Sequence, residues 1–288
     1  MLLLVLMAVA TSVIFGALGA WTATKGADGC RYRVAAAAGN GVLGRLAAVH
    51  LELRRQLGAM GAYLFVLLAG LAAVVAVCWP LGRLARRSLP LDESVFRYFS
   101  THQSPTMTSA MDVLTQMGNR WLVKDVVVVA MVILGMLWRR HWWVPAVVLT
   151  TSYAAEKSLQ DILGKVVDRG HPPTGLGTYP SGGCAQLIAV YGVVWLLVLL
   201  PSRGHPRPRR RIVGAGWMVF GVAAAMEGFS RIYLLKHWSS DVVGGWVFGV
   251  LLLGVIAAAT AALPRPTGAA PAGAAAAGPA RKRAAASA

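Results

Sequence analysis

Seven long apolar stretches constrain the fold of this chain more than any other feature of its sequence. A helix needs about 20 mostly apolar residues to cross a lipid bilayer, and each stretch comes close to that length. They are Met1–Trp21, Gly58–Leu81, Trp121–Trp138, Trp142–Leu163, Cys184–Pro201, Ile212–Leu234 and Ser239–Leu263. Tryptophans at many of their ends fit the aromatic belts of the two membrane surfaces. The sequence therefore predicts an all-α integral membrane protein.

Charge is scarce in this chain, and it is strongly one-sided. Only 14% of the 288 residues are charged, where a soluble domain has about 25%, yet 28 Lys and Arg against 11 Asp and Glu give a net charge of +17. When the spans are counted, most basic residues fall on one side, although Arg83, Arg86 and Arg87 do not. The segments on that side are Lys25–Arg55, Arg139–Arg140, Arg203–Arg211 and Arg281–Arg283.

The positive-inside rule makes this basic side the cytoplasm, as for the plasma membrane of a bacterium. The C-terminus then lies in the cytoplasm. The loops on the opposite side of the membrane are extracytoplasmic. The arginine run orients the helices and attracts the head groups of anionic membrane lipids. Nucleic acid is not an expected partner, because no folded domain or aromatic platform accompanies the run.

The same patterns divide the chain into three parts. Residues 1–58 hold the first apolar stretch and a basic segment, and this region is a candidate docking site for a membrane protein partner. Residues 59–263 form a six-helix transmembrane core. Residues 264–288 are an Ala/Gly/Pro-rich basic tail that we expect to be disordered. Three scattered cysteines give no disulfide framework and no metal-binding spacing.

The segment SRIYLLKHWSSD, from Ser230 to Asp241, carries the clearest chemistry. If the chain is helical from His237, Asp241 lies at i+4 and can hold the imidazole by a hydrogen bond. A carboxylate behind a histidine fixes its tautomer and makes the other nitrogen nucleophilic. Arg231 offers a permanently charged fork for phosphate oxygens, and Glu227 lies one helical turn before it.

A second polar loop lies on the same side of the predicted membrane. In TYPSGGC, Ser181 and the backbone N–H groups of Gly182 and Gly183 are expected to point at an anion from the start of a helix. Upstream, GKVVDRGHPP adds a lysine, an arginine and a histidine to the loop: Lys165, Arg169 and His171. Together the two loops form the cationic pocket that phosphoryl transfer through a phosphohistidine requires. The surrounding cations disfavour a metal ligated by His237 and Asp241, and no cofactor is expected.

These motifs resemble the three signatures of the type 2 phosphatidic acid phosphatase (PAP2) superfamily. The third signature, Ser-Arg-x5-His-x3-Asp, is matched completely. TYPSGG is similar to the second, Pro-Ser-Gly-His, and KVVDRGHPP to the first, Lys-x6-Arg-Pro. LDESVFRYF followed by TQMGNRW also resembles the segment before the family's first catalytic span, so the resemblance covers roughly Leu89–Leu263.

The resemblance implies a six-helix core whose metal-free site lies at the outer face of the membrane. In that case His237 is the nucleophile and Asp241 orients it. The phosphate binders are then Arg231, Ser181 and Lys165.

Two departures from the family pattern affect this interpretation. Gly183 stands where the second signature has the histidine that acts as general acid. The arginine of the first signature is also replaced: aligning on Pro173 keeps Lys165 in register and puts Pro172 at the arginine position. Aligning on Pro172 puts His171 there and Gly164 at the lysine position.

Three outcomes follow from the missing acid, which supplies roughly 10²–10⁴-fold in rate. An active enzyme would favour a polyprenyl diphosphate or a similar lipid, because its leaving phosphate needs little protonation; a phosphotransferase is a variant of this outcome. Alternatively, His171 replaces the missing acid. In the third outcome the protein is a scaffold that binds a lipid phosphate without turnover.

Overall fold

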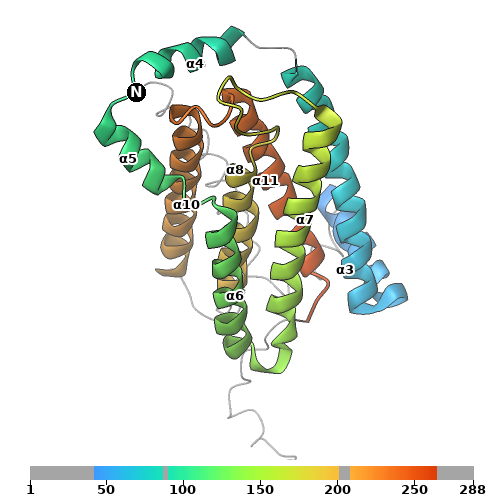
Figure 1. Cartoon of the computed structure of the whole chain (residues 1–288). Coiled ribbons are helices and arrows are strands. Elements are labelled where there is room, and N and C mark those ends of the chain that lie inside the picture. The colour runs from blue at the N-terminus through green and yellow to red at the C-terminus, as the bar shows by residue number, and fades with distance from the viewer. Residues whose placement is uncertain (1–41, 87–89, 201–207, 265–288) are drawn as a thin grey trace, which may run out of the picture.

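The computed structural model describes residues 42–86, 90–200 and 208–264, and the regular structure in these ranges is entirely helical (Figure 1). The predicted all-α class is confirmed. The helices are α3 (Val42–Ala85), α4 (Pro90–Thr101), α5 (Pro105–Leu114), α6 (Arg120–Leu137), η1 (Arg139–His141), α7 (Trp143–Val167), α8 (Gly182–Gln186), the π-helical η2 (Leu187–Tyr191), α9 (Gly192–Leu199), α10 (Pro208–Tyr233) and α11 (Ser239–Thr260).

The long helices run side by side as an upright bundle, with α4 and α5 at one end of it (Figure 1). Helix α11 packs against α3, α7, α8 and α10. Helices α8, η2 and α9 follow one another without a break, so Gly182–Leu199 acts as one span. Six predicted spans thus correspond to α3, α6, α7, the α8–α9 unit, α10 and α11.

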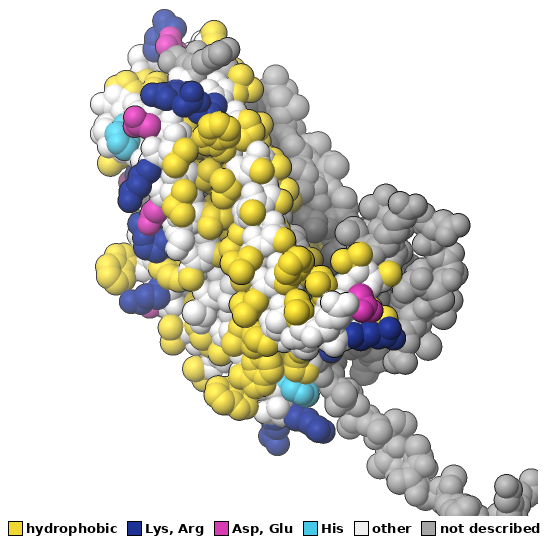
Figure 2. Space-filling view, turned by 90° about the vertical axis from the view of Figure 1, so that its right-hand side faces the viewer, with side chains coloured by type: hydrophobic (Ala, Val, Ile, Leu, Met, Phe, Trp, Pro, Cys, Tyr) yellow, Lys and Arg dark blue, Asp and Glu magenta, His cyan; other side chains and the backbone are white. Residues whose placement is uncertain are grey.

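Four helical stretches among the described residues are long and apolar enough to cross a membrane: Ala48–Ala85, Gly182–Leu199, Ile212–Tyr233 and Ser239–Thr260. Helices α6 and α7 are also long, but they carry charged residues towards the end of the bundle that holds α4 and α5. Figure 2 shows hydrophobic side chains spread over one broad face, with lysines and arginines towards the ends and along one edge. Large apolar side chains that face outwards suit contact with lipid tails.

The start of the second predicted span is marked by a break in α3. Gly58 has a φ of +71°, a left-handed conformation that glycine adopts without steric cost. The helix therefore bends at Gly58, and the straight apolar part that follows it corresponds to the predicted span Gly58–Leu81.

Several predicted features lie outside the described residues. These are the first apolar stretch Met1–Trp21, the arginines from Arg203 to Arg207, and the tail from residue 265 onwards. The three-part division of the chain accordingly stays a prediction. Arg139 and Arg140 are described, and they follow the end of α6 that is remote from its first residue, Arg120.

The segment LDESVFRYF lies within helix α4, which lies across the end of the bundle (Figure 1). The first turn of α4 has two acidic residues. Glu93 is exposed, but Asp92 is only 2% exposed. A buried carboxylate needs partners, and those of Asp92 come from the polar loops of the candidate site.

Candidate active site

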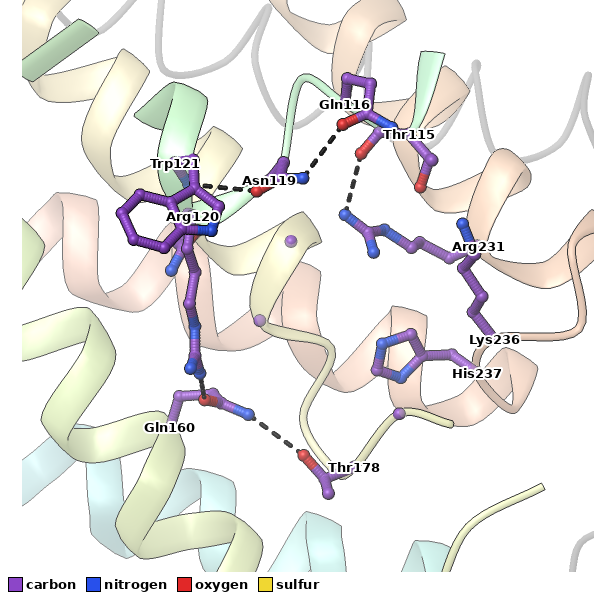
Figure 3. Close-up of a pocket in the computed structure, with 15 residues that line it drawn as sticks. Thr115, Gln116, Asn119, Arg120, Trp121, Gln160, Thr178, Arg231, Lys236 and His237 are labelled. Carbon is purple, nitrogen blue, oxygen red and sulfur yellow. Dashed lines mark hydrogen bonds between the residues drawn. The ribbon is translucent and has the colours of Figure 1, made fainter. Parts of the chain in front are cut away.

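A cavity of about 530 Å³ opens at the end of the bundle that carries α4 and α5 (Figure 3). Its walls come from the turn between α5 and α6, from α7, from the loop before α8 and from the end of α10. The lining residues are Thr115, Gln116, Gly118, Asn119, Arg120, Trp121, Gln160, Gly177, Thr178, Gly182, Gly183, Gln186, Arg231, Lys236 and His237.

His237 lies in the loop between α10 and α11, and its ring lines this cavity (Figure 3). Its Nδ1 lies 3.7 Å from Oδ2 of Asp241, in the first turn of α11. That distance suits an ion pair once the imidazole is protonated, and it leaves Nε2 as the nitrogen for attack. Burial lowers the pKa of His237, while Asp241 opposes this shift. The imidazole is therefore neutral at neutral pH, as a nucleophile must be.

The backbone of the loop before α8 presses against this histidine. Gly177 has a φ of +72°, and a Cβ atom on it would lie 2.7 Å from Nδ1 of His237. No side chain fits at this position. The close approach of Gly177 fixes one face of the imidazole while the cavity keeps the other accessible.

Arg231 is held at the cavity wall by two interactions. Its Nε donates to Oε1 of the fully buried Glu227 at 2.7 Å, and its Nη2 donates to the carbonyl oxygen of Thr115 at 3.0 Å. Glu227 thus orients Arg231 one helical turn away, as the spacing suggested. Among the described residues, Nη1 of Arg231 has no protein acceptor, so it remains available to a ligand.

The same ion pair explains why residue 183 is a glycine. A Cβ atom there would lie 2.8 Å from both Cζ of Arg231 and Oε1 of Glu227. The pair therefore occupies the space into which a side chain at residue 183 would extend. A histidine cannot be placed there without moving Arg231.

The structure separates the predicted phosphate-binding turn into two parts. Gly182 and Gly183 line the cavity, whereas Ser181 is fully buried and does not. The hydroxyl of Ser181 contacts Sγ of Cys184 at 3.4 Å, and its N–H donates to the carbonyl oxygen of Asp241 at 3.0 Å. Ser181 thus ties the turn to α11 in this structure.

Arg169, which was predicted as a phosphate binder, is not among the residues that line the cavity. Its side chain is 4% exposed, and Nη1 donates to Oδ1 of Asp241 and to Oγ of Ser240, both at 2.6 Å. Nη2 pairs with Asp92 of α4. With both ends of its fork on carboxylates, Arg169 has little capacity left for a ligand.

Asp92 completes this buried network. Its Oδ1 accepts from the Ser239 hydroxyl at 2.5 Å and from the Ser240 N–H at 2.9 Å, and its Oδ2 accepts from the Ser240 hydroxyl at 2.6 Å. Although burial raises the pKa of Asp92, the hydrogen bonds from Ser239, Ser240 and Arg169 outweigh it and hold the pKa below its usual value. A continuous chain of contacts therefore runs from α4 through Arg169 and Asp241 to His237.

Lys165 and His171 also lie outside the cavity lining. Lys165 is exposed in the last turn of α7, because the helix turns this position away from the site. His171 is exposed, and its Nδ1 hydrogen-bonds the carbonyl oxygen of Gly177. Since a carbonyl only accepts, Nδ1 keeps its proton, and Nε2 can donate one only from the imidazolium form.

Two cavity residues, Arg120 and Gln160, were not predicted as part of the site. Arg120 begins α6, and its Nη2 donates to Oε1 of Gln160 at 2.9 Å. Gln160 in turn donates to Oγ1 of Thr178 at 3.2 Å. The segment TQMGNRW, which resembles the family sequence, was the available signal for Arg120, but it gave no role to any residue.

Lys236, an outer-side cation next to His237 in the sequence, also lines the cavity, and its Nζ lies 3.4 Å from Oδ1 of Asp112. In the described ranges, no group of three or more His, Cys, Asp or Glu side chains is placed to hold a metal ion.

Residues 143–265 match the family model of the PAP2 superfamily. This part of the chain is therefore similar to the PAP2 superfamily. Phosphatidylglycerophosphatase B from Bacillus subtilis (strain 168) is 24% identical over 174 residues, which cover 57% of this chain and 81% of that protein. This relative supports a phosphoric ester hydrolase.

A solved structure shows the same fold. It is the first transmembrane PAP2 type phosphatidylglycerolphosphate phosphatase from Bacillus subtilis, which matches with a TM-score of 0.53 and 21% identity. The match covers 65% of this chain and 93% of the solved one. The helical bundle therefore has the architecture of a membrane PAP2 protein.

Proposed function

We propose that this protein hydrolyses a lipid-linked phosphate or diphosphate through a phosphohistidine at His237. One observation carries the proposal: a neutral, carboxylate-backed histidine shares a cavity with the arginine Arg231, whose Nη1 is free for a ligand among the described residues. Membrane phosphate esters are the matching substrates, because the cavity lies at one end of an apolar helical bundle.

In the proposed reaction, Nε2 of His237 attacks the terminal phosphorus in line with the leaving oxygen. A P–N bond forms while the P–O bond breaks, and the electron pair stays on the departing oxygen. Asp241 stabilises the positive charge that develops on the imidazole. Arg231 and the N–H groups of Gly182 and Gly183 face the phosphoryl oxygens. Water then attacks the phosphohistidine, which releases phosphate and restores the neutral histidine.

The leaving group favours diphosphate lipids in this proposal. A departing alkoxide is a strong base that needs a proton, and residue 183 offers no acid to give one. A departing phosphate is stable without that proton. We therefore place polyprenyl diphosphate and similar lipids ahead of simple monoesters. Transfer to an acceptor hydroxyl in place of water would give the phosphotransferase variant.

The experiment is a substrate panel with purified full-length protein in detergent. Phosphate release is measured from a polyprenyl diphosphate, its monophosphate and phosphatidylglycerophosphate, for the native protein and for His237→Ala. We expect native turnover, fastest on the diphosphate, and none with the variant. A native protein that binds these lipids but releases no phosphate would instead support the scaffold alternative.

We also propose that the cavity faces the extracytoplasmic side. The pair Arg139–Arg140 follows the far end of α6, and the positive-inside rule places such residues in the cytoplasm. Single cysteines at Arg97 and Arg140, in a background without Cys30, Cys78 and Cys184, would test this in whole cells. A membrane-impermeant thiol reagent should label only the cysteine at residue 97. Labelling at residue 140 alone would reverse the orientation.

A further inference from the structure

The cavity has a second cationic wall that none of the three family signatures contains. Arg120 and Gln160 lie on one side of it, and His237 and Arg231 lie on the other (Figure 3). We propose that Arg120, held by Gln160, forms a second phosphate subsite that binds the leaving phosphate of a diphosphate lipid. This inference rests on the proposed function and names the residue that gives it diphosphate preference.

Arg120 is positioned but not used up by its protein contacts. Its Nη2 reaches Oε1 of Gln160 at 2.9 Å and Oδ1 of Asp161 at 3.3 Å. Among the described residues, its Nη1 and Nε have no protein acceptor, and the side chain is 49% exposed. Asp161 is shared with Lys157 at 2.6 Å, so this cluster of two cations and one carboxylate keeps a positive charge.

Gln160 connects this wall to the turn that lines the middle of the cavity. Its Nε2 donates to Oγ1 of Thr178, and a Cβ atom on Gly182 would lie 3.4 Å from its Cδ. The next residue, Gly183, packs against Arg231 in the same way. Of these two consecutive glycines, Gly182 thus lies beside Gln160, which holds Arg120, and Gly183 lies beside Arg231. Two phosphates joined by a bridging oxygen need such a pair of adjacent cationic positions.

The position of Arg120 suits the charge that develops on the leaving group. When Nε2 of His237 bonds to the terminal phosphorus, the bond to the bridging oxygen breaks. Its electron pair stays on that oxygen, which departs within the lipid monophosphate. An in-line attack directs this group away from His237, to the side where Arg120 lies.

Arginine helps a phosphate leave but does little for an alkoxide. Its guanidinium stays protonated, so it stabilises an anion without giving up a proton. The lipid tail departs with the leaving phosphate, and Trp121, which is 73% exposed and lines the cavity beside Arg120, offers it an apolar surface. The Arg120 wall therefore selects a diphosphate over a monophosphate with the same tail.

The test compares farnesyl diphosphate with farnesyl phosphate, using the purified full-length protein in detergent. The variant is Arg120→Gln, and the control is Arg97→Gln, which removes the same charge from an exposed position on α4 outside the cavity lining. We expect Arg120→Gln to lower kcat/KM for the diphosphate about 10- to 100-fold, the range for hydrogen bonds to a charged group. The monophosphate value should change less than about threefold, and Arg97→Gln should change neither.

Equal losses on the two substrates, or no loss on either, would overturn the subsite. A second measurement needs no variant: inorganic pyrophosphate should inhibit the native protein at least about tenfold better than orthophosphate, and equal inhibition also overturns it. A native protein that hydrolyses only the monophosphate leaves the phosphatase proposal standing and removes the subsite. A native protein inert on every lipid phosphate removes the proposed function itself.

Discussion

Arg169 and Arg231 both meet buried carboxylates, yet only Arg231 lines the cavity with His237. Arg169 is 4% exposed and binds Asp92 and Asp241 with the two ends of its fork. Arg231 is 16% exposed and lines the cavity, where it binds Glu227 through Nε and the Thr115 carbonyl oxygen through Nη2 and keeps Nη1 for a ligand. The first arginine is enclosed by the protein, whereas the second keeps donors for a ligand.

The network around Arg169 and the cavity wall that holds Arg231 also differ in net charge. Two carboxylates and one guanidinium leave the Arg169 network with one excess negative charge, which the imidazolium formed on phosphorylation of His237 can balance. Glu227 offsets Arg231 in the cavity wall, but Lys236 and Arg120 add positive charge there. One region therefore supports the histidine, and the other suits an anion.

The largest effect is expected from Arg231→Lys. A lysine is a single point of charge and cannot hold Glu227 and a phosphoryl group together as a planar fork does. Arginines that stabilise a transferring phosphoryl group contribute about 10³–10⁵-fold, so we expect kcat/KM for a lipid phosphate to fall at least about 10³-fold. Arg140→Lys, at the other end of the bundle, serves as the matched control. A loss below tenfold would show that Arg231 does not face the phosphate.

Arg169→Gln should act first on stability. Removing one partner of a buried ion pair costs about 3–5 kcal/mol, and here it leaves both Asp92 and Asp241 without their cation. Thermal unfolding in detergent should show the loss, and the remaining activity should fall through kcat while KM stays constant. Adding Asp92→Asn removes one unpaired charge and should restore part of the stability. A variant that folds normally but has a raised KM would place Arg169 at the substrate after all.

The local part of this site could be predicted from the sequence. The i,i+4 spacing of Glu227 with Arg231, and of His237 with Asp241, brings each pair together because both lie on or beside helices. The apolar stretches likewise predicted the helices from Gly58 onwards, since a span must satisfy its backbone hydrogen bonds internally.

The partners that join distant segments could not be predicted in this way. Asp92 lies 77 residues before Arg169, and Arg120 lies 40 residues before Gln160. No periodicity relates such positions, because only the packing of α4 and α6 on the bundle brings them to the loops. Lys165 and Arg169 were predicted as phosphate binders because they are cations, and charge does not show which way a side chain turns.

Gly183→Ala should have a smaller effect. Its Cβ would crowd Arg231 and Glu227, and such overpacking costs about 1–3 kcal/mol. If the guanidinium moves to make room, kcat/KM should fall about 10- to 100-fold. Gly214→Ala is a suitable control, because a Cβ atom there meets open space within the described structure. Gly183→Ala with native activity would show that Arg231 has more freedom than its contacts suggest. Gly183→His would not restore a general acid, because its side chain would clash with Arg231 and Glu227 in the same way.

The smallest effect concerns pH and tests whether the Arg169 network acts through His237. Burial lowers the pKa of His237 from its usual value near 6.5, so the neutral nucleophile persists below that pH. The acid limb of kcat/KM, which reports the free enzyme, should accordingly lie below pH 6.5.

Asp241 raises the pKa of His237 against the effect of burial. Asp241→Asn should therefore move the acid limb to lower pH, by about one unit for each 1.4 kcal/mol of lost interaction, and should lower the rate on the plateau. Arg169→Gln should move the limb the other way, because it leaves the charge of Asp241 uncompensated beside the imidazole. Identical limbs in the three proteins would mean that the group titrating in the assay is not His237.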